Sequence, residues 1–313
     1  MYYPYFRGKQ FELITIREMA QLFADKGFTP VIEPVRESLN GLKRALAAIH
    51  EAGGQAIVIV NPCHGDHQTD GGSITSYLEE EFTGSTNISA GILLRNEMSV
   101  DDAFYCINQH LGHSPVLVHS GFTDPKALAS SLEEKNLMSQ LTNIFIDDYA
   151  KLLYRKHFGS SKRILIRDGF NRQRNADYPE VEVFSELHAT YDELGMNGFG
   201  DFLTVGDVYT EGGGPAYAVA IHLTFIDPDK DDVMYIYHFV SDTKDTPTDP
   251  AGKFAQALKK LIIKLDSGNS GIFESQAIEE FRALHKKGHF PGLGYAKKLS
   301  MKHHIETLAN YLN

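Results

Sequence analysis

Polar and charged side chains stand where short apolar runs of this chain end. Among them are four acids and one histidine: Glu33, Asp147, Asp168, Asp207 and His119. We expect Glu33, His119 and Asp168 to be catalytic, with His119 carrying protons, since histidine titrates near neutral pH. We expect Glu33, Asp147 and Asp168 to hold Mg²⁺ or Mn²⁺, because hard cations prefer carboxylate oxygens. Two alternatives stay open: repulsion raises one carboxyl pKa and makes a general acid, or each acid caps a helix or pairs with an arginine.

Basic and amide side chains follow the apolar runs as well. Arginine suits phosphate and carboxylate groups because its guanidinium donates two parallel hydrogen bonds. The side chains that we expect to bind a ligand are Arg7, Lys9, Asn61, Arg95, Arg172 and Asp207. Acids beside arginines are what a phosphate-bearing or nucleotide-like ligand held with a metal requires. The alternative is a set of solvated ion pairs, each contributing about 0–1 kcal/mol.

A third cluster lies in the polar segment 61–75. Its residues Cys63-His64-Gly65-Asp66-His67 carry four side chains that can bind zinc. The spacing matches no standard zinc finger, and adjacent ligands do not easily reach one ion. We therefore interpret the segment as a mobile polar loop, with zinc as the alternative.

Buried strands that alternate with helices would position these side chains. Eight apolar runs carry the pattern: Tyr2–Phe6, Thr29–Ile32, Ala56–Val60, Gly91–Leu94, Pro115–Val118, Asn143–Ile146, Ile164–Ile166 and Phe202–Val205. Their rhythm predicts an α/β fold, a (β/α)8 TIM-like barrel whose strand ends gather on one functional rim. The eighth strand stays open between Phe202–Val205 and Ala216–Phe225, and a helix is expected over Val181–Leu194.

The last third of the chain predicts an antiparallel hairpin and helices. Ala216–Phe225 and Val233–Val240 are strong strands, on which His222 and His238 can face each other. We assign residues 1–240, with the hairpin 216–240, to the barrel, and residues 253–313 to a C-terminal helical segment packed on it.

Composition limits the class of protein. The 313 residues carry a formal net charge of −11, which argues against a general nucleic-acid-binding surface. No apolar run approaches the roughly 20 residues that span a bilayer, and the first residues lack a secretory signal. Two cysteines fit a reducing compartment. We therefore expect a cytoplasmic protein without a membrane partner.

Several short segments resemble one known group of proteins. They are Tyr3–Leu13, Pro30–Val35, Asn61-Pro62, Gly200–Phe202 and Tyr209-Thr210. Over about residues 1–240 the chain resembles the bacterial and phage "beta family protein" group, whose uncharacterised members sit in mobile elements and phage-defence islands. The resemblance implies a barrel-like protein linked to antiviral defence, often encoded beside a second protein. It implies no particular catalytic residue.

Together these observations predict a phage-defence-associated barrel whose rim binds a phosphate-bearing or nucleotide-like ligand. If it is an enzyme, we expect metal-assisted hydrolysis or transfer, as in a phosphodiesterase. The alternative is a non-catalytic sensor or partner subunit that binds a peptide or a companion protein from the same operon. In that case the hairpin and the C-terminal helices would form the docking surface.

Overall fold

The computed structural model describes residues 1–312. They form two compact units, and the chain passes between the two more than once. The first unit comprises Met1–Arg167 and Thr190–Asp201, and the second comprises Asp168–Ala189 and the chain from Phe202 onward.

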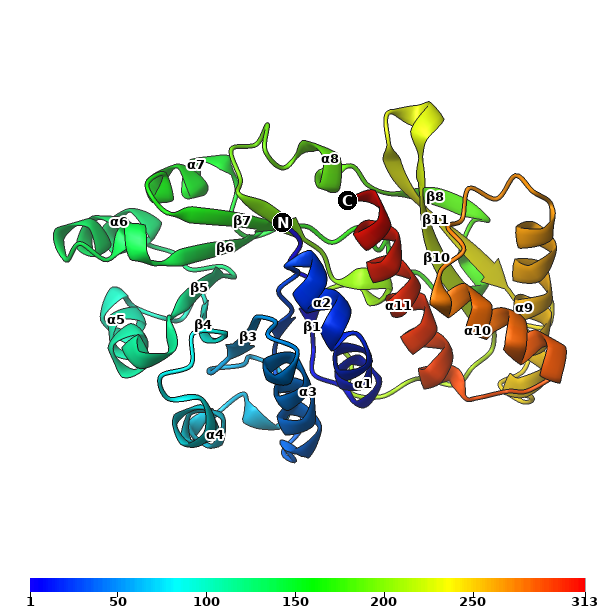
Figure 1. The fold of residues 1–313 in the computed structure, drawn as a ribbon, viewed down its shortest axis with the longest axis horizontal. Coiled ribbons are helices and arrows are strands. Elements are labelled where there is room, and N and C mark those ends of the chain that lie inside the picture. Colours follow the sequence, from blue (N-terminus) through cyan, green and yellow to red (C-terminus); the bar gives the residue numbers. More distant parts are fainter. Residues whose placement is uncertain (313) are drawn as a thin grey trace. The chain divides into compact units, whose positions relative to one another are not determined.

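The first unit is built around a parallel sheet of eight strands in the order β1-β2-β3-β4-β5-β6-β7-β9. The strands are β1 (Tyr5–Phe6), β2 (Val31–Ile32), β3 (Ala56–Ile59), β4 (Ile88–Leu94), β5 (Val116–His119), β6 (Thr142–Ile146), β7 (Lys162–Ile166) and β9 (Gly198–Gly200). Most of their side chains are buried, as expected for parallel strands that are covered on both faces. The sheet curls into a barrel-like ring with helices on its outside (Figure 1).

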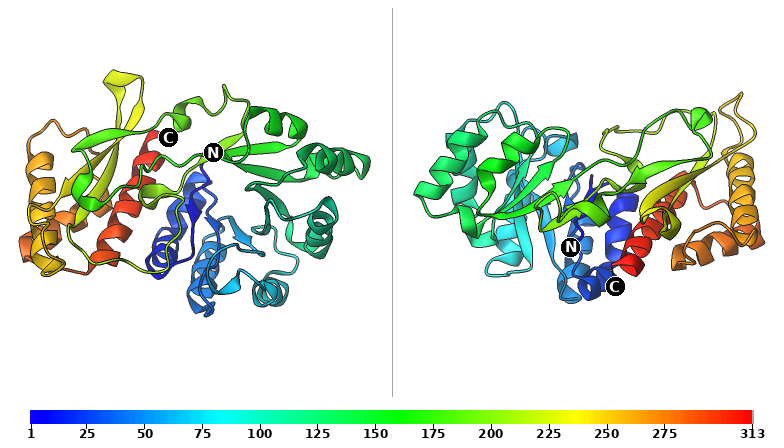
Figure 2. Two further views of the ribbon diagram at one scale, coloured as in Figure 1. Left: turned by 180° about the vertical axis from the view of Figure 1, so that it is seen from behind. Right: turned by 90° about the horizontal axis from the view of Figure 1, so that it is seen from above.

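The two edges of this sheet meet, and the ring closes there. A parallel bridge joins Tyr2 to Phe199. The Tyr3 N–H donates to the Phe199 carbonyl at 2.8 Å, and the Tyr5 N–H donates to the Asp201 carbonyl at 2.9 Å. Figure 2 shows the same ring from two further sides. The prediction of a mixed α/β protein with an eight-stranded, barrel-like parallel sheet is therefore confirmed.

The strand that completes the ring is neither of the two predicted candidates. It is the Gly-Phe-Gly segment β9, whose glycines lie where β1 approaches closely. A Cβ on Gly200 would stand 2.0 Å from the Tyr3 carbonyl oxygen, and one on Gly198 would stand 2.7 Å from the Met1 carbonyl oxygen. Glycine weakens a strand in isolation. Here it is required, because another backbone occupies the space of its side chain.

Seven helices cover the first unit between its strands. They are α1 (Gln10–Glu18), α2 (Ala20–Lys26), α3 (Asn40–Glu51), α4 (Gly72–Phe82), α5 (Val100–Gln109), α6 (Pro125–Glu134) and α7 (Leu152–Arg155). Helix α5 begins with a capping box in which Ser99 and Asp102 bond each other's backbone N–H groups. Helix α6 begins with an Asp124 cap followed by Pro125, which suits the first helical turn.

The second unit contains a three-stranded antiparallel sheet in the order β10-β11-β8. The strands are β10 (Ala220–Asp227), β11 (Val233–Val240) and β8 (Val181–Ser185). Strands β10 and β11 form the predicted hairpin. The predicted helix over Val181–Leu194 is wrong. The segment forms β8, which pairs with β11, and then the single turn α8 (Leu187–Thr190), because pairing with a distant strand overrides a weak helical pattern.

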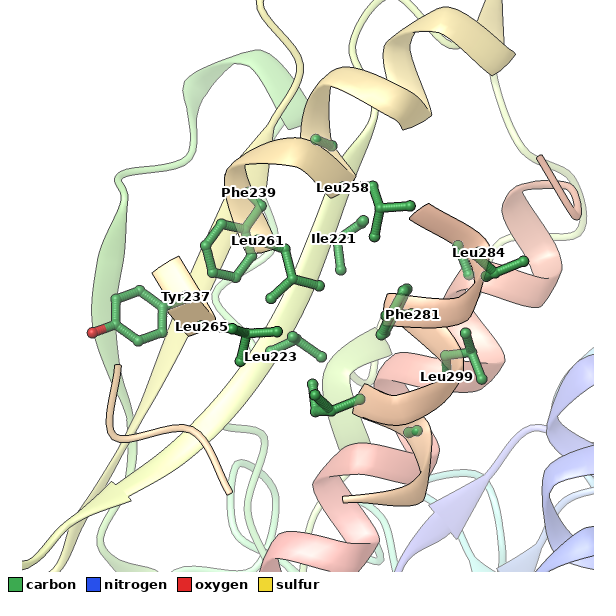
Figure 3. Close-up of a cluster of buried hydrophobic side chains, with 14 of the residues drawn as sticks. Ile221, Leu223, Tyr237, Phe239, Leu258, Leu261, Leu265, Phe281, Leu284 and Leu299 are labelled. Carbon is green, nitrogen blue, oxygen red and sulfur yellow. The ribbon is translucent and has the colours of Figure 1, made fainter. Parts of the chain in front are cut away.

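Three C-terminal helices pack on this sheet. They are α9 (Pro250–Asp266), α10 (Gln276–Lys287) and α11 (Leu293–Tyr311). Figure 3 shows the core they share with the hairpin, in which Leu223 of β10, Leu261 of α9 and Phe281 of α10 are fully buried or nearly so. The hairpin therefore belongs to one compact unit with the helices, whereas the sequence-based prediction assigns it to residues 1–240 and the helices to residues 253–313. Within residues 1–312, no helix has the length and apolarity needed to cross a bilayer.

Candidate functional site at the carboxyl ends of the barrel strands

The carboxyl ends of the parallel strands define one rim of the first unit, here called the mouth. Glu33 lies there, directly after β2, and its side chain is completely buried. It forms an ion pair with Arg7, which follows β1. The hydroxyl of Tyr5 donates to Glu33 Oε2 at 3.0 Å, and the N–H of Cys63 donates to Oε1 at 3.0 Å. Groups from β1 and from the segments that follow β1 and β3 thus surround the Glu33 carboxylate at the end of β2.

Glu33 is ionised at neutral pH. Burial would raise its pKa, but the hydrogen bond from His64 and the positive charge of Arg7 outweigh that effect. Together with the Cys63 N–H they lower the pKa to about 2. A buried carboxylate costs several kcal/mol of desolvation, and it is tolerated where, as here, a cation and several donors satisfy it.

Cys63 and His64 complete the cluster, and both are half-buried. His64 Nδ1 lies 3.0 Å from Glu33 Oε1 and 3.1 Å from Cys63 Sγ. Cys63 Sγ lies 3.4 Å from the same oxygen. Burial and the negative charge of Glu33 raise the pKa of the Cys63 thiol to about 12, so the group is protonated and a poor nucleophile.

The segment that carries Cys63 and His64 is held against the end of β2. Gly65 has a φ of +70° and lies so close to Val35 that a Cβ would stand 2.1 Å from the Val35 carbonyl oxygen. The Asp66 carboxylate accepts the Glu37 N–H at 2.7 Å, and the His67 ring bonds the Arg36 carbonyl oxygen at 2.9 Å. Residues 63–67 thus contact the segment that follows β2 through Gly65, Asp66 and His67.

Two more of the predicted ligand-binding residues lie at the ends of β3 and β4. The Asn61 amide bonds both the N–H and the carbonyl of Leu93, at 2.8 and 2.9 Å, and so extends the pairing of β3 with β4. Arg95 pairs with Glu97 at 2.8 Å, and about a quarter of its side chain is exposed. Its positive charge opposes the rise in the pKa of Cys63. Lys9 precedes α1 as its N-terminal flanking residue.

His119 is located away from this cluster. Its ring is fully buried and stacks on Phe145 of β6 with centroids 4.7 Å apart. The ring nitrogens bond the Tyr154 hydroxyl and the Asn143 side-chain oxygen, each at 2.8 Å. Burial lowers the pKa of His119 to about 4, so the ring is neutral at neutral pH. These partners belong to β6 and the helical segment after it, which fits a structural role.

The remaining predicted acids bond other groups. Asp147, after β6, accepts from Arg155 through Oδ1 at 2.9 Å and from Arg167 through Oδ2 at 2.7 Å. This is the ion-pair alternative that the sequence left open. Neither arginine was among the predicted site residues, although Arg167 ends an apolar run just as Arg95 does.

Asp168, Asp207 and Arg172 belong to the second unit. Asp168 accepts the Phe170 N–H through Oδ1 at 2.9 Å and the Asp207 N–H through Oδ2 at 2.7 Å. Arg172 donates to the Val208 carbonyl at 2.9 Å. The structure thus brings Asp168 and Asp207 together, as it does Glu33 and Arg7.

The predicted histidine pair of the hairpin is confirmed. His222 and His238 are directly opposite in the register, with their Nδ1 atoms 2.7 Å apart. His238 Nε2 also lies 3.0 Å from the Glu182 carboxylate of β8. Tyr178 stacks on His238 at 4.4 Å. The pair is therefore satisfied within its own sheet.

Comparison with known proteins does not indicate a function for this chain. No family model matches the chain, and no curated protein does. Among solved structures, the enoyl reductase domain of MlnA from the macrolactin biosynthesis cluster of Bacillus amyloliquefaciens aligns with a TM-score of 0.38 and 10% identity. The alignment covers 99% of this chain and 80% of that chain. Likeness at this level carries no conclusion about fold or chemistry.

Proposed function

We propose that this chain is a (β/α)8, TIM-like protein that binds a phosphate-bearing or nucleotide-like ligand at the mouth around Glu33. The observation that carries the proposal is that Arg7 and His64 both contact one buried carboxylate, Glu33, while Arg95 follows β4 of the same parallel sheet. Parallel barrels place their functional groups at this end of the strands. The phage-defence role and the cytoplasmic location rest on the sequence and its resemblance alone.

The charges at the mouth favour an anion. Arg7 neutralises Glu33, and Arg95, which follows β4, adds a second guanidinium whose charge acts on the pKa of Cys63. Arg95 meets Glu97 through Nε, and that acid is more than half exposed, so solvent weakens the pair. Guanidinium groups bind phosphate oxygens bidentately, and a partly exposed one can reorient toward a ligand at low cost.

The test is binding of inorganic phosphate, AMP and ADP, measured by calorimetry. We expect saturable binding of at least one of them, and a loss of about tenfold or more in affinity in Arg95→Ala, since a charge-assisted hydrogen bond contributes about 1.5–3 kcal/mol. Arg44→Ala is the matched control, because Arg44 lies on an exposed face of α3 and the variant loses the same charge. Equal affinities of the two variants would contradict the proposed site.

A specific observation keeps the alternative function, a companion-binding subunit, in view. Strand β8 is an edge of the small sheet, and its Val181 and Val183 are 42% and 58% exposed. An exposed edge with β-branched side chains can pair with a strand of another protein. If the chain acts in this way, Val183→Lys should abolish copurification of the neighbouring gene product, whereas Arg95→Ala should leave it intact.

A further inference from the structure

We propose that Glu33, Cys63 and His64 form a three-ligand site for Zn²⁺ at the mouth of the barrel-like sheet. The inference deepens the proposed function, since the ion would sit where the anion is expected to bind, but ion binding can be tested without any anion. It replaces the expected Mg²⁺ or Mn²⁺ set of Glu33, Asp147 and Asp168.

The geometry of the three ligand atoms carries the inference. Glu33 Oε1, Cys63 Sγ and His64 Nδ1 are mutually 3.0, 3.1 and 3.4 Å apart. Bond lengths of about 2.0–2.3 Å to zinc place tetrahedral ligand atoms roughly 3.3–3.8 Å from one another. Each pair therefore needs to separate by only about half an ångström or less. Within residues 1–312, Glu33, Cys63 and His64 form a group whose ligand atoms lie close enough for one ion.

The element types of the three ligand atoms favour zinc. One sulfur, one nitrogen and one oxygen suit zinc, whereas Mg²⁺ and Mn²⁺ favour oxygen alone. Among residues 1–312, the group of close ligand atoms that contains Glu33 includes Cys63 and His64 but neither Asp147 nor Asp168. Binding zinc would replace the thiol proton of Cys63, which leaves to solvent, while Glu33 is ionised already.

Adjacent residues can both reach the ion because of how their backbone is held. His64 is extended, with φ −126° and ψ 156°, and it uses Nδ1, the ring nitrogen nearer the backbone. Gly65 then turns the chain against Val35. Asp66 and His67 have other partners, which removes them from the ligand set that the sequence suggested.

The residues around the three ligands hold the Glu33 carboxylate in a fixed orientation, as residues around a metal centre do. Glu33 Oε2 is held by Arg7 and by the Tyr5 hydroxyl, so the carboxylate has a fixed orientation with Oε1 toward Cys63 and His64. The His64 side chain is 30% exposed, so the cluster reaches solvent on one side. Three protein ligands with one open position are the arrangement found where zinc also binds an exchangeable group. That position would accept an oxygen of the ligand's phosphate.

The experiment measures metal content and the absorption spectrum of the full chain loaded with Zn²⁺ or Co²⁺. We expect one equivalent of either ion, and for Co²⁺ a thiolate-to-metal charge-transfer band. Cys63→Ser should abolish the band and weaken Zn²⁺ binding by at least about 100-fold, and His64→Gln should also weaken binding. Cys106→Ser, which removes the other half-buried thiol, should leave both unchanged.

The outcomes separate the two proposals. Absence of a stoichiometric ion, or a band that survives Cys63→Ser, overturns the zinc site. Phosphate binding that persists without the ion then leaves the proposed function standing. Zinc binding without any affinity for phosphate, AMP or ADP would instead support the zinc site and contradict the proposed function. Cys63 and His64 are only half-buried, so these variants should fold, and thermal unfolding of each checks that they do.

Discussion

Replacing Gly200 by alanine tests the ring closure on which the mouth depends. The new Cβ would stand 2.0 Å from the Tyr3 carbonyl oxygen, 2.9 Å from the Tyr3 carbonyl carbon and 3.0 Å from a side-chain carbon of Ile166. A carbon and a backbone oxygen normally stay more than 3 Å apart, so β1 and β9 must separate by about 1 Å. That movement stretches the two nearest closing hydrogen bonds, from the N–H groups of Tyr3 and Tyr5.

The expected cost is about 3 kcal/mol. Two backbone hydrogen bonds contribute about 0.5–1.5 kcal/mol each, and overpacking in a rigid interior adds about 1–3 kcal/mol. Urea denaturation followed by circular dichroism measures the change in the free energy of unfolding. Hydrogen exchange at the Tyr3 and Tyr5 amides should accelerate in the variant, because those N–H groups lose their partners.

Gly112→Ala is the matched control. Gly112 is exposed in the same unit, and its Cβ would have no neighbour within 4 Å. Its stability should change by less than about 1 kcal/mol. If Gly200→Ala unfolds at the same urea concentration as Gly112→Ala, with the two amides equally protected, the strands do not meet as described.

Two further predictions concern buried ionisable groups. Arg7→Ala should lower the free energy of unfolding by about 3–5 kcal/mol, because it leaves the Glu33 carboxylate buried without its cation. The double variant Arg7→Ala/Glu33→Gln should recover part of that loss. Urea denaturation that shows the single and the double variant to be equally unstable would contradict this account. His119 should make the stability of the protein depend on pH. Its pKa is about 4 in the folded chain and 6.5 ordinarily, so between these values the unfolded chain binds the proton more readily. The free energy of unfolding should therefore fall by up to about 3 kcal/mol as the pH drops from 6.5 to 4. His119→Gln should remove that part of the pH dependence of the urea midpoint, whereas His50→Gln, at an exposed position, should not.

The barrel-like sheet was predictable because its signal is local. Seven apolar runs, each bounded by polar residues, coincide with β1–β7, and burial on both faces of a parallel strand requires such runs. The strand β9 could not be found in this way. Its glycines are explained by the Met1 and Tyr3 carbonyls, which lie almost 200 residues away in sequence. The same holds for β8, which is a strand only because β11 lies beside it.

The cluster around Glu33 was predictable in its position at the strand ends, but only some of its residues were predictable. Glu33 and Arg7 follow neighbouring parallel strands, so their meeting follows from topology. His119 also ends a strand, but side chains alternate between the two faces of a strand, and its ring lies among Phe145, Tyr154 and Phe158. From the sequence alone, a histidine at the end of a buried strand is equally compatible with either face.

The grouping of Cys63 and His64 with Glu33 depends on contacts that the sequence motif does not contain. Four candidate ligands within five residues suggested a self-contained site or none, since adjacent side chains point in different directions. In the structure these residues form two pairs. Cys63 and His64 lie beside Glu33, whereas Asp66 and His67 bond backbone groups of the segment after β2. The division depends on the left-handed conformation of Gly65 and on its approach to Val35, a contact between separate loops. A Gly65→Ala variant cannot adopt that approach, so in the zinc proposal it should lose the ion even though every ligand is still present.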